Sequence, residues 1–126
     1  MNRGEDRAPA EGSPDEALPT TPTPEWGVRA FQDQIERIYG ARDRARGVSG
    51  TFLWFSEEVG ELARSLNSGS RGSLEESREF ADVFAWLASL ASMRGIDLAS
   101  AAREKYAAGC PRCGNTPCDC SHRTRE

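Results

Sequence analysis

The chain has 126 residues, a net charge of −4 and 37% hydrophobic residues. This length allows one domain, and the acidic balance argues against nucleic-acid binding, since a duplex-binding protein usually carries a basic stripe. No apolar run in the sequence approaches the roughly 20 residues that span a membrane, and the first residues lack the apolar segment of a secretory signal. We therefore expect a cytoplasmic protein with no membrane or nucleic-acid partner.

The first 24 residues differ in composition from the rest of the chain. They carry five of the seven prolines and several acids, with few large aliphatic side chains. Such a segment cannot bury enough apolar surface to offset its ordering entropy. We expect residues 1–24 to form a disordered tail, residues 25–108 a helical domain, and residues 109–126 a cysteine-rich tail.

Helical periodicity begins at Trp26 and predicts a first helix. Its apolar stripe is Val28, Phe31, Ile35 and Ile38. Gly40 and the charged stretch 41–47 are expected to end or loosen it. A second helix should then be capped by Ser49 or Thr51. Its apolar stripe is Phe52, Phe55, Val59, Leu62 and Leu66.

A turn is expected at residues 67–72, and two further helices follow it. Ser73 and Glu76 have the spacing of a capping box, and Asp97 is placed to cap a short helix that runs through Tyr106. The stripe of the third helix is Phe80, Val83, Leu87 and Leu90. No strand-like alternation competes, so the fold class is all-α, a four-helix bundle.

Four helices over about 80 residues make a small core. The third helix is apolar nearly all round between Phe80 and Ala91, and such a helix is usually buried on more than one side. We therefore expect the bundle to be completed by oligomerisation, as a homodimer or homotetramer.

Two pairs of acids border the predicted core. Glu58 and Glu61 lie on the second helix and Glu79 and Asp82 on the third, each pair spaced i, i+3 and so on one helical face. If the two helices pack antiparallel, both pairs line one groove, where they would repel strongly without a cation. A lone pair of this kind is usually a solvated helix face, but two matched pairs favour a metal site.

The donor set indicates which metal. Carboxylates without a nearby histidine or thiolate favour Mg²⁺ or Mn²⁺. A di-iron bundle would need Glu-x-x-His motifs, and the single histidine is His122, near the C-terminus.

These motifs resemble those of the MazG-like family of all-α nucleotide pyrophosphohydrolases. The resemblance rests on Glu57-Glu58-Val59-Gly60-Glu61, Glu79-Phe80-Ala81-Asp82, Gly95-Ile96-Asp97-Leu98 and Lys105. It implies hydrolysis of a nucleoside triphosphate to the monophosphate and pyrophosphate. It also implies that Mg²⁺ is held at the catalytic acids Glu58, Glu61, Glu79 and Asp82.

Lys105 lies where the family often has a phosphate-facing lysine, which implies substrate binding. The family commonly has an Asn three residues earlier, where this chain has Ala102. Trp54 and Trp86 flank the acids by one helical turn, and each is either a core residue or a platform for a base. The alternative to an enzyme is a non-catalytic helical adaptor with a zinc-stabilised tail that mediates protein contacts.

Four cysteines fall within eleven residues of the C-terminal tail, namely Cys110, Cys113, Cys118 and Cys120. Cys-Pro-x-Cys-Gly is a knuckle in which the backbone turns so that two thiolates converge on one ion, and Cys-x-Cys supplies two more. In a cytoplasmic protein this clustering favours zinc over disulfides. Redox-active or unliganded thiols remain an alternative, and His122 is a substitute ligand for Cys120.

Overall fold

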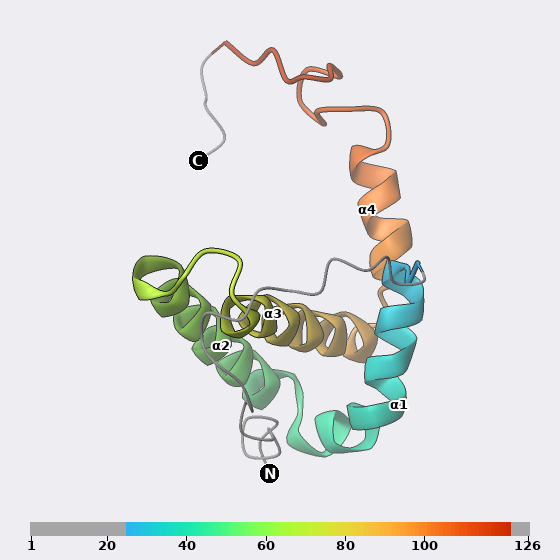
Figure 1. Cartoon of the computed structure of the whole chain (residues 1–126). Coiled ribbons are helices and arrows are strands. Elements are labelled where there is room, and N and C mark those ends of the chain that lie inside the picture. The colour runs from blue at the N-terminus through green and yellow to red at the C-terminus, as the bar shows by residue number, and fades with distance from the viewer. Residues whose placement is uncertain (1–24, 122–126) are drawn as a thin grey trace.

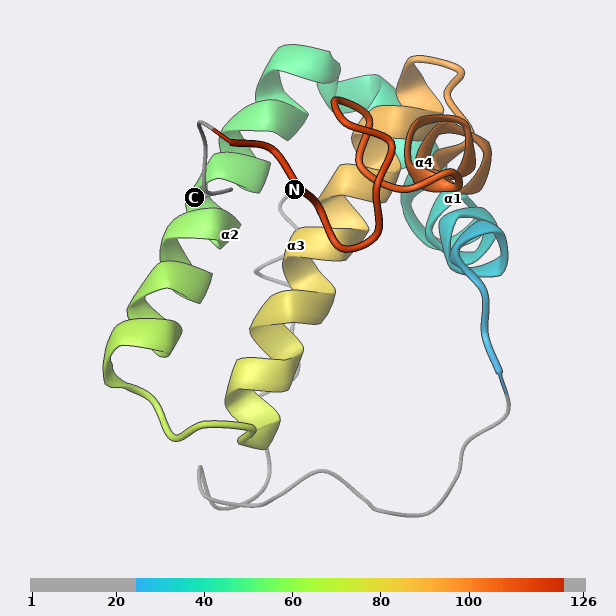
Figure 2. The ribbon, with the colours of Figure 1, turned by 90° about the horizontal axis from the view of Figure 1, so that it is seen from above.

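The computed structural model describes residues 25–121, which contain four helices and no strand (Figure 1). Helix α1 spans Val28–Arg46, α2 Val48–Ser68, α3 Leu74–Met93 and α4 Leu98–Tyr106. α2 and α3 run side by side in opposite directions, and α1 packs on both (Figure 2). The predicted all-α fold is confirmed. The predicted tail 1–24 and His122 lie outside the described residues.

Two of the predicted helix starts are confirmed by their caps. The Ser73 hydroxyl accepts a hydrogen bond from the backbone N–H of Glu76 (3.1 Å), and the Glu76 carboxylate accepts one from the N–H of Gly72 (2.5 Å). The Asp97 carboxylate accepts from the N–H of Ser100 (3.0 Å) at the start of α4. These bonds satisfy N–H groups that a helix N-terminus leaves without a partner.

The predicted boundary between the first two helices is wrong. α1 continues through Gly40 to Arg46, and α2 begins at Val48, so neither Ser49 nor Thr51 is its cap. Gly47 alone connects the helices, with φ of +87°. A glycine adopts this backbone conformation at little cost, whereas a residue with a Cβ is strained there.

The charged stretch remains helical because two of its side chains have partners inside the bundle. Asp43 accepts hydrogen bonds from Ser89 of α3 (2.5 Å) and from Arg46 (3.0 Å). Arg46 also donates to Thr51 of α2 (3.3 Å), and its guanidinium lies 5.0 Å from the centre of the Trp86 ring. Asp43, Ser89 and Thr51 are buried. This polar network therefore connects α1, α2 and α3 through groups that compensate each other's burial.

Aromatic packing completes the contact of α1 with α3. The rings of Phe31 and Phe84 stack with their centres 4.6 Å apart, and Ile35 is buried on the same helix as Phe31. Trp86 is 1% exposed, which identifies it as a core residue rather than a platform for a base.

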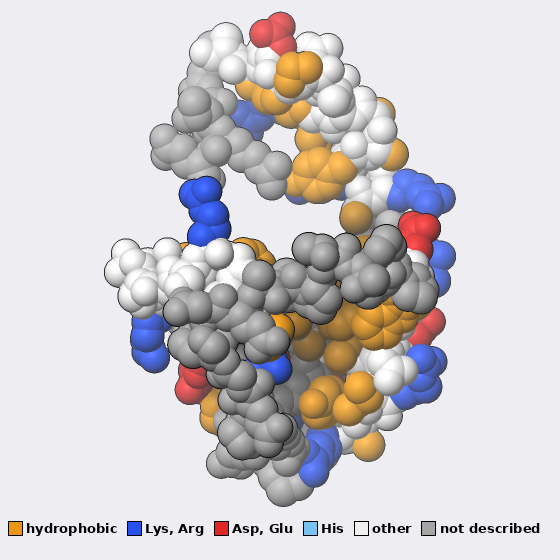
Figure 3. Space-filling view, viewed as in Figure 1, with side chains coloured by type: hydrophobic (Ala, Val, Ile, Leu, Met, Phe, Trp, Pro, Cys, Tyr) orange, Lys and Arg blue, Asp and Glu red, His pale blue; other side chains and the backbone are white. Residues whose placement is uncertain are grey.

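Much of the predicted apolar stripe of α2 and α3 is exposed in the protomer. The side chains concerned are Phe52 (54% exposed), Val59 (41%), Leu66 (55%), Phe80 (53%) and Leu87 (40%). Hydrophobic side chains are accordingly visible at the molecular surface in Figure 3. The prediction that these residues form the protomer core is wrong, because the two helices turn a different face toward each other and bury Glu58 and Glu79 instead.

Gln32 fixes the loop that leads to α4. Its side-chain amide donates to the Ser92 hydroxyl (3.0 Å) and the Ile96 carbonyl (2.8 Å), and its oxygen accepts from the N–H of Leu98 (2.9 Å). At the surface, Arg29 of α1 donates to the Asp97 carboxylate at 2.7 Å. α4 thus packs against α1, while most of the α4 surface stays exposed.

Candidate metal centres and active site

The antiparallel packing of α2 and α3 brings three of the predicted acids together. One carboxylate oxygen each of Glu58, Glu61 and Glu79 lies within 4.8 Å of the others. Glu58 is 5% exposed and Glu79 is 8% exposed, whereas Glu61 is half-buried. The i, i+3 spacing directs Glu58 and Glu61 to one face of α2, and Glu79 meets them from α3.

Three carboxylate oxygens in and beside this cluster are buried. Glu58 Oε2, Glu79 Oε2 and Asp82 Oδ2 are buried and accept no hydrogen bond from the described residues, although each of the three side chains makes other polar interactions. Buried carboxylate oxygens are costly unless they are compensated. A cation is one compensation that suits several of them at once.

The geometry of the cluster fits a small hard cation. Mg²⁺ binds oxygens at about 2.0–2.1 Å in an octahedron, so two of its ligands lie about 3–4 Å apart. The oxygens of Glu58, Glu61 and Glu79 are within 4.8 Å of one another, close to this range. Because Mg²⁺ retains several waters, three carboxylates leave coordination positions for water and phosphate oxygens.

A cavity of about 350 Å³ adjoins the cluster at the turn between α2 and α3. Its lining residues are Glu61, Arg64, Ser65, Ser68, Gly69, Ser70, Ser73, Glu75 and Glu79. Arg64 contributes a cation to this cavity, and guanidinium groups attract phosphate. Arg64 could not be found from the sequence, because an arginine three positions after Glu61 has no distinguishing pattern.

Asp82 and Lys105 lie outside this group of three. Asp82 follows Glu79 by one turn of α3, and its Oδ2 is buried. Lys105 is exposed on α4, with its Nζ 5.5 Å from the centre of the Tyr106 ring. Lys105 lines a separate cavity of about 520 Å³ that includes Arg112 and three of the cysteines. Within one protomer, the lysine therefore lies beside the cysteine cluster.

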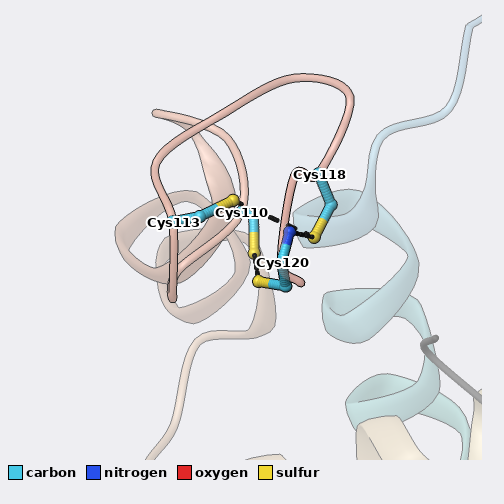
Figure 4. Close-up of side chains that lie close together, drawn as sticks. All are labelled: Cys110, Cys113, Cys118 and Cys120. Atoms are coloured by element: carbon cyan, nitrogen blue, oxygen red, sulfur yellow. Dashed lines mark hydrogen bonds between the residues drawn. The ribbon is translucent and has the colours of Figure 1, made fainter. Parts of the chain in front are cut away.

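The four cysteines converge as the sequence predicts (Figure 4). Their sulfur atoms all lie within 4.8 Å of one another, and all four are free thiols. The knuckle turn is closed by backbone hydrogen bonds from Gly114 N to Cys110 O (2.7 Å) and from Cys110 N to Asn115 O (3.0 Å). At Gly109, where φ is +110°, a Cβ would lie 2.9 Å from the Gly114 carbonyl oxygen. Only glycine fits there without displacing the turn.

The sulfur spacing fits tetrahedral zinc. Four sulfurs at about 2.3 Å from a zinc ion lie about 3.8 Å from one another. The Sγ atoms of Cys110 and Cys120 are 3.8 Å apart, and those of Cys113 and Cys118 are 3.9 Å apart. The N–H of Asp119 donates to Cys113 Sγ (3.3 Å) and the N–H of Cys120 to Cys118 Sγ (3.4 Å).

The backbone of the knuckle favours thiolate at its first two cysteines. The N–H of Cys113 is the main cause that lowers the pKa of Cys110 to about 6, and the N–H of Asp119 is the main cause that lowers the pKa of Cys113. The hydrogen bond with Cys118 is the main cause that raises the pKa of Cys120 to about 12. Thiolate is the form that binds metal, so the turn prepares part of the ligand set.

Comparison with curated proteins gives no match. The sequence model of the MazG nucleotide pyrophosphohydrolase domain matches residues 47–113. This range begins at the connection between α1 and α2 and includes all three clustered carboxylates. It covers more than half of the chain, and the fold and the acidic cluster agree with it. The chain therefore belongs to the MazG nucleotide pyrophosphohydrolase family.

Proposed function

We propose that this protein is a Mg²⁺- or Mn²⁺-dependent pyrophosphohydrolase that converts a nucleoside or deoxynucleoside triphosphate to the monophosphate and pyrophosphate. Family membership supports a nucleotide pyrophosphohydrolase. The observation that carries the metal dependence is the convergence of Glu58, Glu61 and Glu79 within 4.8 Å beside a cavity. The carboxylates would otherwise repel one another at short range in a poorly hydrated site.

The proposed roles follow from burial. Glu58 and Glu79, both buried, hold the metal from opposite helices, and Glu61, half-buried and lining the cavity, faces the substrate side. Asp82 is proposed as a fourth metal-binding acid on the strength of its buried Oδ2. When bound, the divalent cation neutralises charge on the phosphate oxygens and favours in-line attack by water.

Arg64 is proposed to receive the polyphosphate. The guanidinium forms directed hydrogen bonds to phosphate oxygens. Arg64 lines the cavity beside Glu61 and Glu79. Lys105 remains a predicted substrate contact, and it lines a different cavity of the protomer.

A pyrophosphate-release assay tests the proposal. Purified protein is incubated with each of the common NTPs and dNTPs in MgCl₂, MnCl₂ or EDTA, and pyrophosphate and monophosphate are quantified. We expect equal amounts of both products, dependent on the divalent ion. Glu61→Gln should lose more than about 100-fold in kcat, which corresponds to about 2.7 kcal/mol of barrier. The matched control is Glu104→Gln, an exposed residue of α4, which should keep full activity.

Failure to hydrolyse any triphosphate with either ion would contradict the proposal. It would leave the non-catalytic helical adaptor as the better description. Equal activity of Glu61→Gln and Glu104→Gln would instead show that the acidic cluster is not the site of hydrolysis.

We further propose that Cys110, Cys113, Cys118 and Cys120 hold a structural zinc ion. The support is the match between their sulfur spacings of 3.8 and 3.9 Å and those of a tetrahedral zinc–sulfur site. Metal analysis of the purified protein should give about one zinc per chain. Cys113→Ser should lose it, whereas Ser121→Ala in the same segment should retain it.

A homodimer or homotetramer is also proposed. The exposed apolar side chains of α2 and α3, including Phe52, Leu66 and Phe80, support an assembly that covers them. Light scattering coupled to gel filtration should give two or four times the mass of one chain, and a monomeric mass at micromolar concentration would contradict the assembly.

No helix among the described residues combines the length and the apolar character of a membrane span. Cytoplasmic location stays a prediction from the sequence.

A further inference from the structure

All four sulfurs of the cysteine knuckle (residues 110–120) lie within 4.8 Å of one another, and two of the contacts between them are hydrogen-bonded. Cys110 Sγ lies 3.8 Å from Cys120 Sγ, and Cys113 Sγ lies 3.9 Å from Cys118 Sγ (Figure 4). A disulfide needs about 2.05 Å, so each pair has less than about 2 Å to close. The inner pair is enclosed by the outer pair along the chain, and the two bonds can therefore coexist without crossing.

The knuckle is also accessible to an oxidant, and backbone hydrogen bonds hold two of its sulfurs in place. Cys118 is exposed, and the other three cysteines are half-buried. Backbone N–H groups donate to the sulfurs of both members of the inner pair, at 3.3 Å for Cys113 and 3.4 Å for Cys118. A cysteine reacts with peroxides through its thiolate.

We propose that the knuckle is a peroxide-sensitive modification site, in which oxidation forms the disulfides Cys110–Cys120 and Cys113–Cys118 and releases zinc. The zinc-release part rests on the proposed zinc site, whereas the pairing rests only on the sulfur geometry. The oxidant is hydrogen peroxide.

In each pair, one thiolate sulfur attacks a peroxide oxygen and the O–O bond breaks, which gives a sulfenic acid and a hydroxide that is protonated to water. The partner thiolate then attacks the sulfenic sulfur, the S–O bond breaks, and the oxygen leaves as a second water after protonation. Two thiolates thus lose two electrons, and one peroxide and two protons are consumed. Two such reactions use all four thiolates, so the zinc ion loses its ligands and is released.

Zinc release is measured with the full chain. Zinc content is determined first, and the protein is then treated with excess hydrogen peroxide in the presence of a chromogenic zinc chelator. We expect release of all bound zinc, loss of all four free thiols, and recovery of both after dithiothreitol and added zinc. Retention of zinc after treatment would overturn the proposal while leaving the zinc site itself intact.

Disulfide pairing is mapped by mass spectrometry, and the sequence makes the map unambiguous. Trypsin cleaves after Lys105, Arg112 and Arg123, so Cys110 is separated from the other three cysteines. Peptides 106–112 and 113–123 should appear as one linked species, and fragmentation should join Cys110 to Cys120. Linkage of Cys110 to Cys113, or an equal mixture of the three possible pairings, would refute the geometric argument.

Cys118→Ser separates the two pairs. In this variant Cys113 lacks its close partner. We expect peroxide still to join Cys110 to Cys120, while Cys113 forms no disulfide and stays a thiol or sulfenic acid. Absence of zinc from the untreated wild-type protein would contradict only the zinc proposal. The disulfide pairing can still be tested on the metal-free chain. Four free thiols after oxidation of that metal-free chain would overturn the modification site.

Discussion

Removal of one carboxylate from the acidic cluster should change the stability of the protein, and the direction of the change should depend on whether a metal ion is bound. Replacing Glu79 by Gln removes one of three carboxylates whose oxygens lie within 4.8 Å of one another. Two unit charges at that separation repel by about 3.5 kcal/mol at an effective dielectric constant of about 20. Proton uptake by a carboxyl of ordinary pKa, about 4.3 for Glu, costs about 3.7 kcal/mol at pH 7 and so limits the total penalty.

We therefore expect Glu79→Gln to be more stable than the wild type in EDTA, by about 1–4 kcal/mol. For a domain of this size that raises the Tm by at least about 4 °C. Magnesium should stabilise the wild type, by about 2.7 kcal/mol when its concentration is 100 times the Kd. Glu79→Gln should be stabilised far less by magnesium. The difference in stability between the variant and the wild type should therefore become smaller in MgCl₂, or change sign.

Thermal unfolding followed by circular dichroism gives the Tm of the wild type and of Glu79→Gln, each in EDTA and in MgCl₂. No substrate is needed. Glu104→Gln on exposed α4 is the matched control and should follow the wild type in both buffers. Destabilisation of Glu79→Gln in EDTA, or an undiminished magnesium shift in that variant, would refute the view of the cluster as a cation site held against mutual repulsion.

Three further outcomes test the packing that supports the site. Asp43→Ala should lower the free energy of unfolding by about 3–5 kcal/mol in urea titrations, because it leaves the charge of Arg46 largely buried without its carboxylate; a loss below about 1 kcal/mol would contradict the network. Gln32→Leu should lower the free energy of unfolding by about 1–3 kcal/mol and accelerate hydrogen exchange in the loop before α4. Unchanged exchange would contradict the role of Gln32 in fixing that loop. The hydrogen bond from Arg29 holds the pKa of Asp97 well below its ordinary 3.8, so this contribution is complete above that pH and is lost as pH falls below it. Asp97→Asn should therefore flatten the acid limb of a stability–pH curve, and an identical limb in both proteins would contradict that assignment.

The local features of the fold were accessible from the sequence because neighbouring residues decide them. Ser73 with Glu76 and Asp97 with Ser100 lie three residues apart, and their capping bonds form as the spacing predicts. The convergence of the cysteines is similarly local, since a short turn brings Cys110 and Cys113 together.

The orientation of the helices was not accessible in the same way. Apolar spacing defines a stripe on α2 and α3, but it does not say which neighbour covers that stripe, or whether the neighbour belongs to the same chain. Phe52 and Phe80 are more than half exposed in the protomer, while Glu58 and Glu79 are buried between the helices. The buried acids at this helix contact replace the apolar residues that usually lie there.

The polar network was missed for a related reason. Asp43 and Ser89 are 46 positions apart, and nothing in the sequence pairs them. In a stretch rich in Arg and Asp, an interior carboxylate looks the same as a solvated one. Its burial depends on the tertiary hydrogen bond from Ser89 of α3, and Arg46, which binds Asp43, also donates to Thr51 of α2.

The position of α1 has a practical consequence for anyone who shortens this protein. The matched family region starts at Gly47, yet in the preceding helix Phe31 stacks on Phe84 of α3 and Arg46 lies over Trp86. A recombinant fragment trimmed to that starting point would expose Trp86 to solvent and strip Ser89 of its carboxylate acceptor. Such a fragment should aggregate or stay unfolded when expressed, so the homology boundary is a poor guide to where the autonomous folding unit begins.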